Sequence, residues 1–176
     1  MRTLIFLFFF AASSLSLSAQ ESRQYYQLKV YSFDTDEQMA TTDAYLKDAF
    51  IPAVKKLDIG PVGVFKPRPT DSITPKQTYV LIPFNSLVKF GLYEDAIMKD
   101  EKHLTGGKAY LTAAHDNAPY QRIETMLMKA FTEMPQMATP NLNGPLKDRV
   151  YELRSYEGAT EDLYRKKWIC SMPAEK

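Results

Sequence analysis

The chain has 176 residues, 45% hydrophobic and 24% charged, a balance that can build a core and excludes a wholly disordered chain. Its length allows one complete domain and part of another. The 22 basic and 21 acidic residues give a formal net charge of +1, without the basic excess that binds phosphates, so nucleic acid is not an expected partner.

The first segment, MRTLIFLFFFAASSLSLSAQ, has the pattern of a secretory signal peptide. Arg2 is followed by an apolar run from Leu4 to Ala12 and then by small residues. This run is well short of the roughly 20 residues of a membrane span, which weighs against the alternative of a membrane anchor. We expect residues 1–19 to be removed, no membrane span to remain, and the mature protein to be secreted or periplasmic.

Residues 24–33, QYYQLKVYSF, alternate between two kinds of position, which predicts a strand. The predicted dry face carries Tyr26, Leu28 and Val30. The predicted mixed face carries Tyr25, Gln27, Lys29 and Tyr31. This division between faces decides which of these side chains can take part in a common site.

A helix is predicted from about 36 to 57, because a capping box precedes apolar residues at helical spacing. The box pairs Thr35 with Gln38, and Pro52 introduces a possible kink in the last turns. A short strand is predicted over 60–66, and the proline-rich stretch after it predicts a loop.

The nearly continuous apolar run QTYVLIPF, residues 77–84, predicts a central strand. A helix follows, with Asn85 or Ser86 as its cap. The pair Gly106-Gly107 is expected to end that helix, and a second helical piece is predicted over 108–116.

Residues 120–131 alternate again and predict a long strand, with Arg122 and Glu124 on the side opposite to Ile123. The order strand, helix, strand, strand, helix, strand is the βαββαβ plan of a ferredoxin-like module, of class α+β, over residues 24–131. Its helices would cover one face of an antiparallel sheet. The other face would stay open unless a second sheet covered it.

Residues 132–148, TEMPQMATPNLNGPLKD, are rich in proline and lack a period, which predicts a linker. The first strand then repeats, because the pattern Y-x-L-[K/R]-x-Y of Tyr26 to Tyr31 returns at Tyr151 to Tyr156. GATEDLYRKKW begins a helix after it, as DTDEQ does after the first copy. Residues 149–176 are therefore predicted to start a second, incomplete copy of the module.

The N-terminal segment, the strand YYQLKVYSF and the repeat RVYELRSYEGATEDLYRKK resemble the NIPSNAP family, over about residues 24–167. That family belongs to the dimeric α+β-barrel superfamily, and its secreted bacterial members commonly carry two ferredoxin-like modules in one chain. The family pattern would continue with a long helix and further strands, whereas this chain continues with WICSMPAEK. We therefore expect a product truncated early in its second module, with a genuine short form as the alternative.

The resemblance implies a cavity where two sheet faces meet, and the alternation of the strands assigns side chains to it. The candidate ligand-binding residues are Gln27, Lys29, Tyr31, Arg122, Glu124, Glu152, Arg154 and Tyr156. Charges of both signs in a cavity can bind a small polar or carboxylate-bearing ligand. The alternative is that Lys29–Glu124 and Glu152–Arg154 pairs only neutralise each other at a sheet–sheet interface.

His103 and His115 are the only histidines, and their spacing fits no compact metal site. We expect both to be exposed near helix ends, and we expect neither a metal nor a cofactor. No serine-hydrolase, zinc-protease, phosphate-loop or CxxC motif is present in the sequence.

Two functions therefore stay open. The first, which we favour, is a small-molecule-binding or interaction module that forms a homodimer through its open sheet face. The second is a cofactor-independent or haem-linked monooxygenase-like or isomerase-like enzyme, which the resemblance to the superfamily implies. A convergent acid–base pair in the cavity would favour the enzyme, and the sequence assigns no catalytic residue.

Overall fold

The computed structural model describes residues 23–69, 74–145 and 148–171. The predicted signal peptide, residues 1–19, lies outside the described residues. Within the part of the chain that is described, no helix combines the length and apolar character that a membrane crossing requires.

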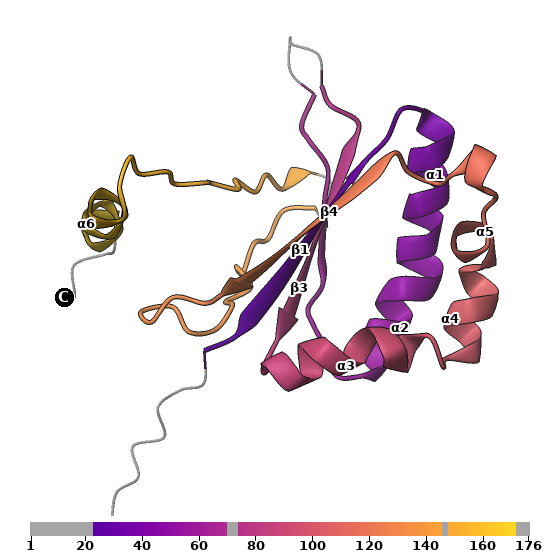
Figure 1. The fold of residues 1–176 in the computed structure, drawn as a ribbon, viewed down its shortest axis with the longest axis horizontal. Helices are drawn as coiled ribbons and strands as arrows, with labels where there is room; N and C mark the ends of the chain where they lie inside the picture. The colour runs from indigo at the N-terminus through magenta and orange to yellow at the C-terminus, as the bar shows by residue number, and fades with distance from the viewer. Residues whose placement is uncertain (1–22, 70–73, 146–147, 172–176) are drawn as a thin grey trace, which may run out of the picture.

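The centre of the fold is an antiparallel sheet of four strands in the order β2-β3-β1-β4 (Figure 1). The strands are β1 (Tyr25–Ser32), β2 (Gly63–Phe65), β3 (Gln77–Phe84) and β4 (Arg122–Lys129). β1 lies between β3 and β4, and Tyr31 is opposite Thr78 on one side and Ile123 on the other. This is the expected α+β, ferredoxin-like arrangement.

The first helical segment runs through α1 (Asp36–Tyr45), the π-helical turn η1 (Leu46–Phe50) and α2 (Ile51–Lys56). The Thr35 side chain accepts from the backbone N–H of Gln38, and the Gln38 side chain binds the cap backbone in return, as predicted. Pro52 lies in the first turn of α2. Proline has no N–H for the carbonyl four residues earlier, and the wider turn just before it accommodates that missing bond.

The second helical segment is divided into α3 (Leu87–Ile97), α4 (Glu101–Gly106) and α5 (Lys108–Leu111), followed by the 3-10 turn η2 (His115–Asn117). Ser86 caps α3 and Asp100 caps α4 through their side-chain oxygens. The predicted break at Gly106-Gly107 separates α4 from α5. The predicted helix over 108–116 is present only as α5 and η2, with an irregular stretch between them.

The helices α1 to α5 lie on one side of the sheet, and the chain after β4 runs on the other side (Figure 1). The core between sheet and helices is largely aromatic and branched-aliphatic. Its most buried members include Tyr31, Val80, Ile82 and Phe84 from the strands and Leu46, Phe50, Val54 and Tyr93 from the helices. Both layers of the fold therefore depend on a single hydrophobic core.

The C-terminal segment differs from the expected second copy in one respect. Residues 149–156 form no strand, whereas the predicted helix is present as α6 (Glu161–Ser171). The ring of Tyr151 packs edge-on against Phe65 of β2, with 5.1 Å between ring centroids. Since a strand needs a partner for its backbone N–H and C=O groups, the repeat of the motif alone does not produce one.

Candidate functional site

The strand β1 faces the opposite way from the prediction. Gln27 and Tyr31 are 3% and 2% exposed and lie on the helix side of the sheet, opposite Ile82 and Thr78 of β3. Lys29 points to the same side, since it lies opposite Val80, a core residue. The predicted placement of these three residues on the open face is wrong.

Arg122 and Glu124 lie on the open face, away from Lys29. They are opposite Ser32 and Val30, and Glu124 is paired with Arg122 at 3.0 Å between Nε and Oε1. Both side chains are more than half exposed. The expected Lys29–Glu124 pair is therefore wrong, because the sheet separates the two side chains.

Glu152 and Arg154 form the pair that the sequence predicted, with 2.7 Å between Oε2 and Nη2. Both lie in the exposed segment after β4, where the Arg154 guanidinium lowers the pKa of the Glu152 carboxyl. Tyr156 hydrogen-bonds to the same guanidinium, which adds to the raised pKa of Arg154 after the larger effect of Glu152. The candidate residues thus lie in separate places and do not form one site.

A different group converges between β1 and α3, which we call the Lys29 cluster: Gln27, Lys29, Tyr93 and Glu94. The Lys29 ammonium donates to Glu94 Oε1 at 2.9 Å. The Tyr93 hydroxyl lies 2.5 Å from Gln27 Oε1 and 2.9 Å from Glu94 Oε1, and can donate to either. The sequence prediction contained Gln27 and Lys29 but missed both α3 residues, because their approach to β1 depends on how α3 packs.

The Lys29 side chain lies among aromatic rings. Its Nζ is 5.7 Å from the ring centroid of Phe50 and 5.8 Å from that of Tyr93. Only 16% of the Lys29 side chain is exposed, against 61% for Glu94. The ammonium is thus held by ring faces and by one carboxylate that itself reaches solvent.

The protonation states in the cluster follow from burial and from Lys29. Desolvation is the largest single effect on Glu94 and raises its pKa, but the hydrogen bonds and charge of Lys29 together with the Tyr93 hydroxyl lower it overall. Burial, together with the charge of Glu94, raises the pKa of Tyr93 well above its ordinary value. At neutral pH Glu94 is therefore an acceptor and Tyr93 a donor.

A tyrosine layer continues the polar contacts away from the cluster. The rings of Tyr45 and Tyr110 stack at 4.0 Å, and Tyr31 hydrogen-bonds to Tyr110. The Tyr45 hydroxyl lies 3.0 Å from His103 Nε2. Burial is the main reason that the pKa of Tyr31 is raised to about 12.

His103 corrects another expectation, since it is 1% exposed instead of lying free at a helix end. His115 is exposed, as expected. Among the described residues, His103 Nδ1 and Thr78 Oγ1 are buried without a hydrogen-bond partner. No group of His, Cys, Asp or Glu in the described part of the chain is arranged to hold a metal ion.

No protein-family model and no curated protein matches the chain. Among solved structures, it is similar to a NIPSNAP family protein of unknown function from Agrobacterium tumefaciens. The two are 17% identical with a TM-score of 0.48, over 66% of this chain and 96% of the other.

Two further solved structures are similar to the chain at lower TM-scores. A dimeric protein of unknown function and ferredoxin-like fold from Bacteroides fragilis is 12% identical, with a TM-score of 0.41, over 60% of this chain and 95% of the other. A Bacillus cereus protein described as a proposed antibiotic biosynthesis monooxygenase is 12% identical, with a TM-score of 0.39, over 61% and 93% of the two chains. The solved structures that this chain is similar to thus include NIPSNAP family proteins, and its own sheet has the ferredoxin-like arrangement.

Proposed function

We propose that this chain is a small-molecule-binding module whose ligand carries an acidic group and binds at the Lys29 cluster. One observation carries the proposal: a largely buried ammonium is neutralised by a carboxylate that is mostly exposed. An acidic ligand can take the place of Glu94 on Lys29 while Glu94 turns into solvent. The Phe50 and Tyr93 rings beside the ammonium are themselves buried in the core and hold the ammonium in this position.

The protonation states favour binding over the alternative of a monooxygenase-like or isomerase-like enzyme. General acid–base catalysis works best when the catalytic group has a pKa near the working pH. The pKa of Glu94 is lowered and that of Tyr93 is raised, so both move away from neutrality. Fixed donors and acceptors of this kind suit the recognition of a ligand.

The proposal is tested with benzoate and the uncharged benzamide, each titrated into the protein and followed by NMR. We expect benzoate to shift signals of β1 and α3 and to bind about ten-fold or more tightly than benzamide, because a charge-assisted hydrogen bond is involved. Lys29→Met keeps the apolar stem and removes the charge, and should abolish the difference between the two compounds.

Lys76→Met is the matched control, because Lys76 pairs with Asp36 in an exposed ion pair. It should bind benzoate as the natural protein does. Equal binding of benzoate and benzamide, or unchanged benzoate binding by Lys29→Met, would contradict the proposed site.

Export and self-association are two further parts of the proposal. The segment 1–19 supports export to the periplasm or beyond, and the mature protein from its native host should begin near Gln20. An intact Met1 on soluble cytoplasmic protein would contradict export. The open sheet face supports a homodimer, since it carries Tyr79 and Leu81 of β3 and Met126 of β4, which is 45% exposed.

A further inference from the structure

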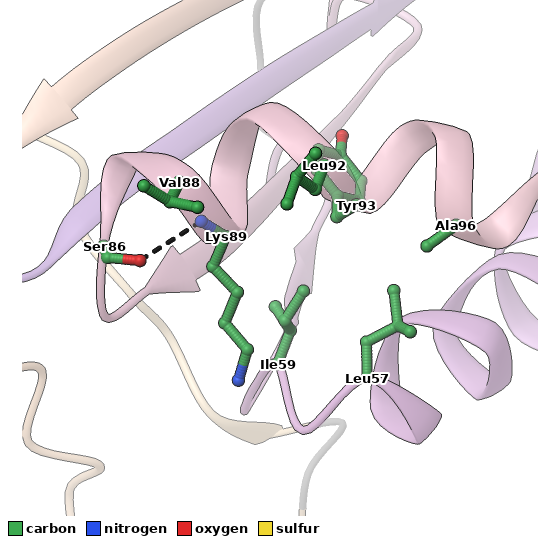
Figure 2. A pocket seen from close by; sticks show the side chains of 8 residues that line it. All are labelled: Leu57, Ile59, Ser86, Val88, Lys89, Leu92, Tyr93 and Ala96. Carbon is green, nitrogen blue, oxygen red and sulfur yellow. Dashed lines mark hydrogen bonds between the residues drawn. The ribbon is translucent and has the colours of Figure 1, made fainter.

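An open pocket of about 290 Å³ lies between α3 and the end of α2 (Figure 2). Of the four residues of the Lys29 cluster, Tyr93 also lines this pocket. The pocket is lined by Leu57, Ile59, Ser86, Val88, Lys89, Leu92, Tyr93 and Ala96. Tyr93 separates the two places, since its ring lines the pocket while its hydroxyl reaches Gln27 and Glu94.

The walls of the pocket are mostly apolar. Leu57 and Ile59 form one side, and Leu92 and Ala96 of α3 form the other (Figure 2). Leu92 is 61% exposed and Val88 at the rim is 70% exposed. Covering such surface removes apolar area from water, which favours a guest with an apolar body.

Lys89 supplies a positive charge at the rim of the same pocket. Its Nζ donates to the backbone carbonyl of Asp58 at 2.8 Å, while the Asp58 carboxylate lies 3.7 Å away, beyond hydrogen-bond distance, and is fully exposed. Asp58 has a left-handed backbone (φ 54°) at the end of α2, a conformation that aspartate tolerates, and its carbonyl lies within reach of Lys89. One bond to a carbonyl leaves the ammonium able to donate to a second acceptor.

We propose that this pocket binds an amphipathic carboxylate, such as a medium-chain fatty acid. The hydrocarbon chain packs between Leu57, Leu92 and Ala96, and the carboxylate accepts from Lys89 Nζ. The exposed Asp58 carboxylate turns away from the head group, because nothing in the described residues other than Lys89 holds it in an ion pair. The complementarity of an apolar wall and a rim cation selects this class over neutral or cationic guests.

The test uses the full protein with decanoate below its micellar concentration, and decanol as the uncharged match, measured by calorimetric titration. We expect decanoate to bind about ten-fold or more tightly than decanol. Lys89→Met should lower the affinity for decanoate to that for decanol. Ala96→Phe fills the pocket and should abolish the binding of both compounds.

Leu92→Gln provides a second variant in case Ala96→Phe fails to fold, because Leu92 is mostly exposed and its replacement disturbs little packing. It should weaken the binding of both decanoate and decanol. Gly91→Ala is the control, since a Cβ at Gly91 meets no atom within 4 Å, and it should bind as the natural protein does.

Absence of decanoate binding, equal binding of decanoate and decanol, or unchanged binding by Lys89→Met or Leu92→Gln would overturn the inference. Lys29→Met separates this site from the Lys29 cluster: it should lose the preference for benzoate and keep decanoate binding. Loss of decanoate binding in Lys29→Met would also overturn the inference, because the two sites would then be one.

Discussion

Lys29 shows how a single side chain can satisfy two environments. Its ammonium lies beside the buried Phe50 ring and also donates to Glu94, which reaches solvent. A buried ammonium without such a partner would be unstable, and this requirement explains why a lysine is tolerated on the helix side of β1. The same reasoning applies to Tyr31, whose hydroxyl is buried but hydrogen-bonded to Tyr110.

Tyr31 should make the protein sensitive to alkaline pH. Burial raises its pKa from 10.0 in the unfolded chain to about 12 in the fold. The stabilising effect of the neutral hydroxyl is therefore complete below pH 10 and is lost as the pH rises toward 12. Tyr31→Phe should make the free energy of unfolding fall less steeply with pH above 10, as measured by urea denaturation at several pH values.

The exposed Tyr151→Phe is the control, and its pH profile should match that of the natural protein. Tyr45, Tyr93 and Tyr110 also have raised pKa values because of burial, so the slope in Tyr31→Phe should be reduced and not abolished. An unchanged slope would show that Tyr31 does not remain protonated in the fold at these pH values.

The helices are shaped by local chemistry at their ends and by contacts in their middle. Thr35, Ser86 and Asp100 begin helices in positions where their side-chain oxygens accept backbone N–H groups. By contrast, Gly107 is needed for close packing, since the backbone there approaches the ring of Tyr45.

Two glycine substitutions should therefore have opposite effects. Gly91→Ala adds a methyl group in open space on α3 and should stabilise the protein by about 0.5–1 kcal/mol. Gly107→Ala places a Cβ 2.8 Å from the His103 carbonyl oxygen and 3.0 Å from the Tyr45 ring, and should cost about 1–3 kcal/mol. Urea denaturation of both variants measures the two free energies, and a Gly107→Ala protein as stable as the natural one would contradict the predicted clash.

At the scale of the whole molecule, the sheet has unequal faces. One is covered by helices, and the other is approached by the chain after β4, where Tyr151 contacts Phe65. Gln24 also binds the chain after β4: its backbone N–H donates to the Pro135 carbonyl, and its Oε1 accepts from the Met137 N–H. Leu28 and Val30, at the centre of the open face, are only 4% exposed within the single chain. A partner would therefore bury additional surface mainly along β4.

We predict that the protein self-associates through this face, and that a variant without residues 140–176 still does. A dimer of ordinary size would bury about 800 Å² on each partner. Met126→Lys should weaken the association, because it places a charge in the interface. Met98→Lys, at the exposed end of α3, is the matched control and should leave it unchanged.

Sedimentation across micromolar concentrations measures these associations. A folded monomer for the natural chain and for the shortened one would contradict self-association. Equal effects of Met126→Lys and Met98→Lys would show that the contact lies elsewhere.

The sequence by itself determined the order and type of the elements up to β4, since caps, glycines and hydrophobic periods act over a few residues. Only the tertiary structure decided which face of β1 meets the helices. Alternation of residue types separates the side chains into two faces but does not show which face packs against the helices, and in β1 both faces are buried. The same applies to His103 and Glu94, whose partners come from distant segments. It applies equally to residues 149–156, where the strand motif returns but none of the described strands pairs with it.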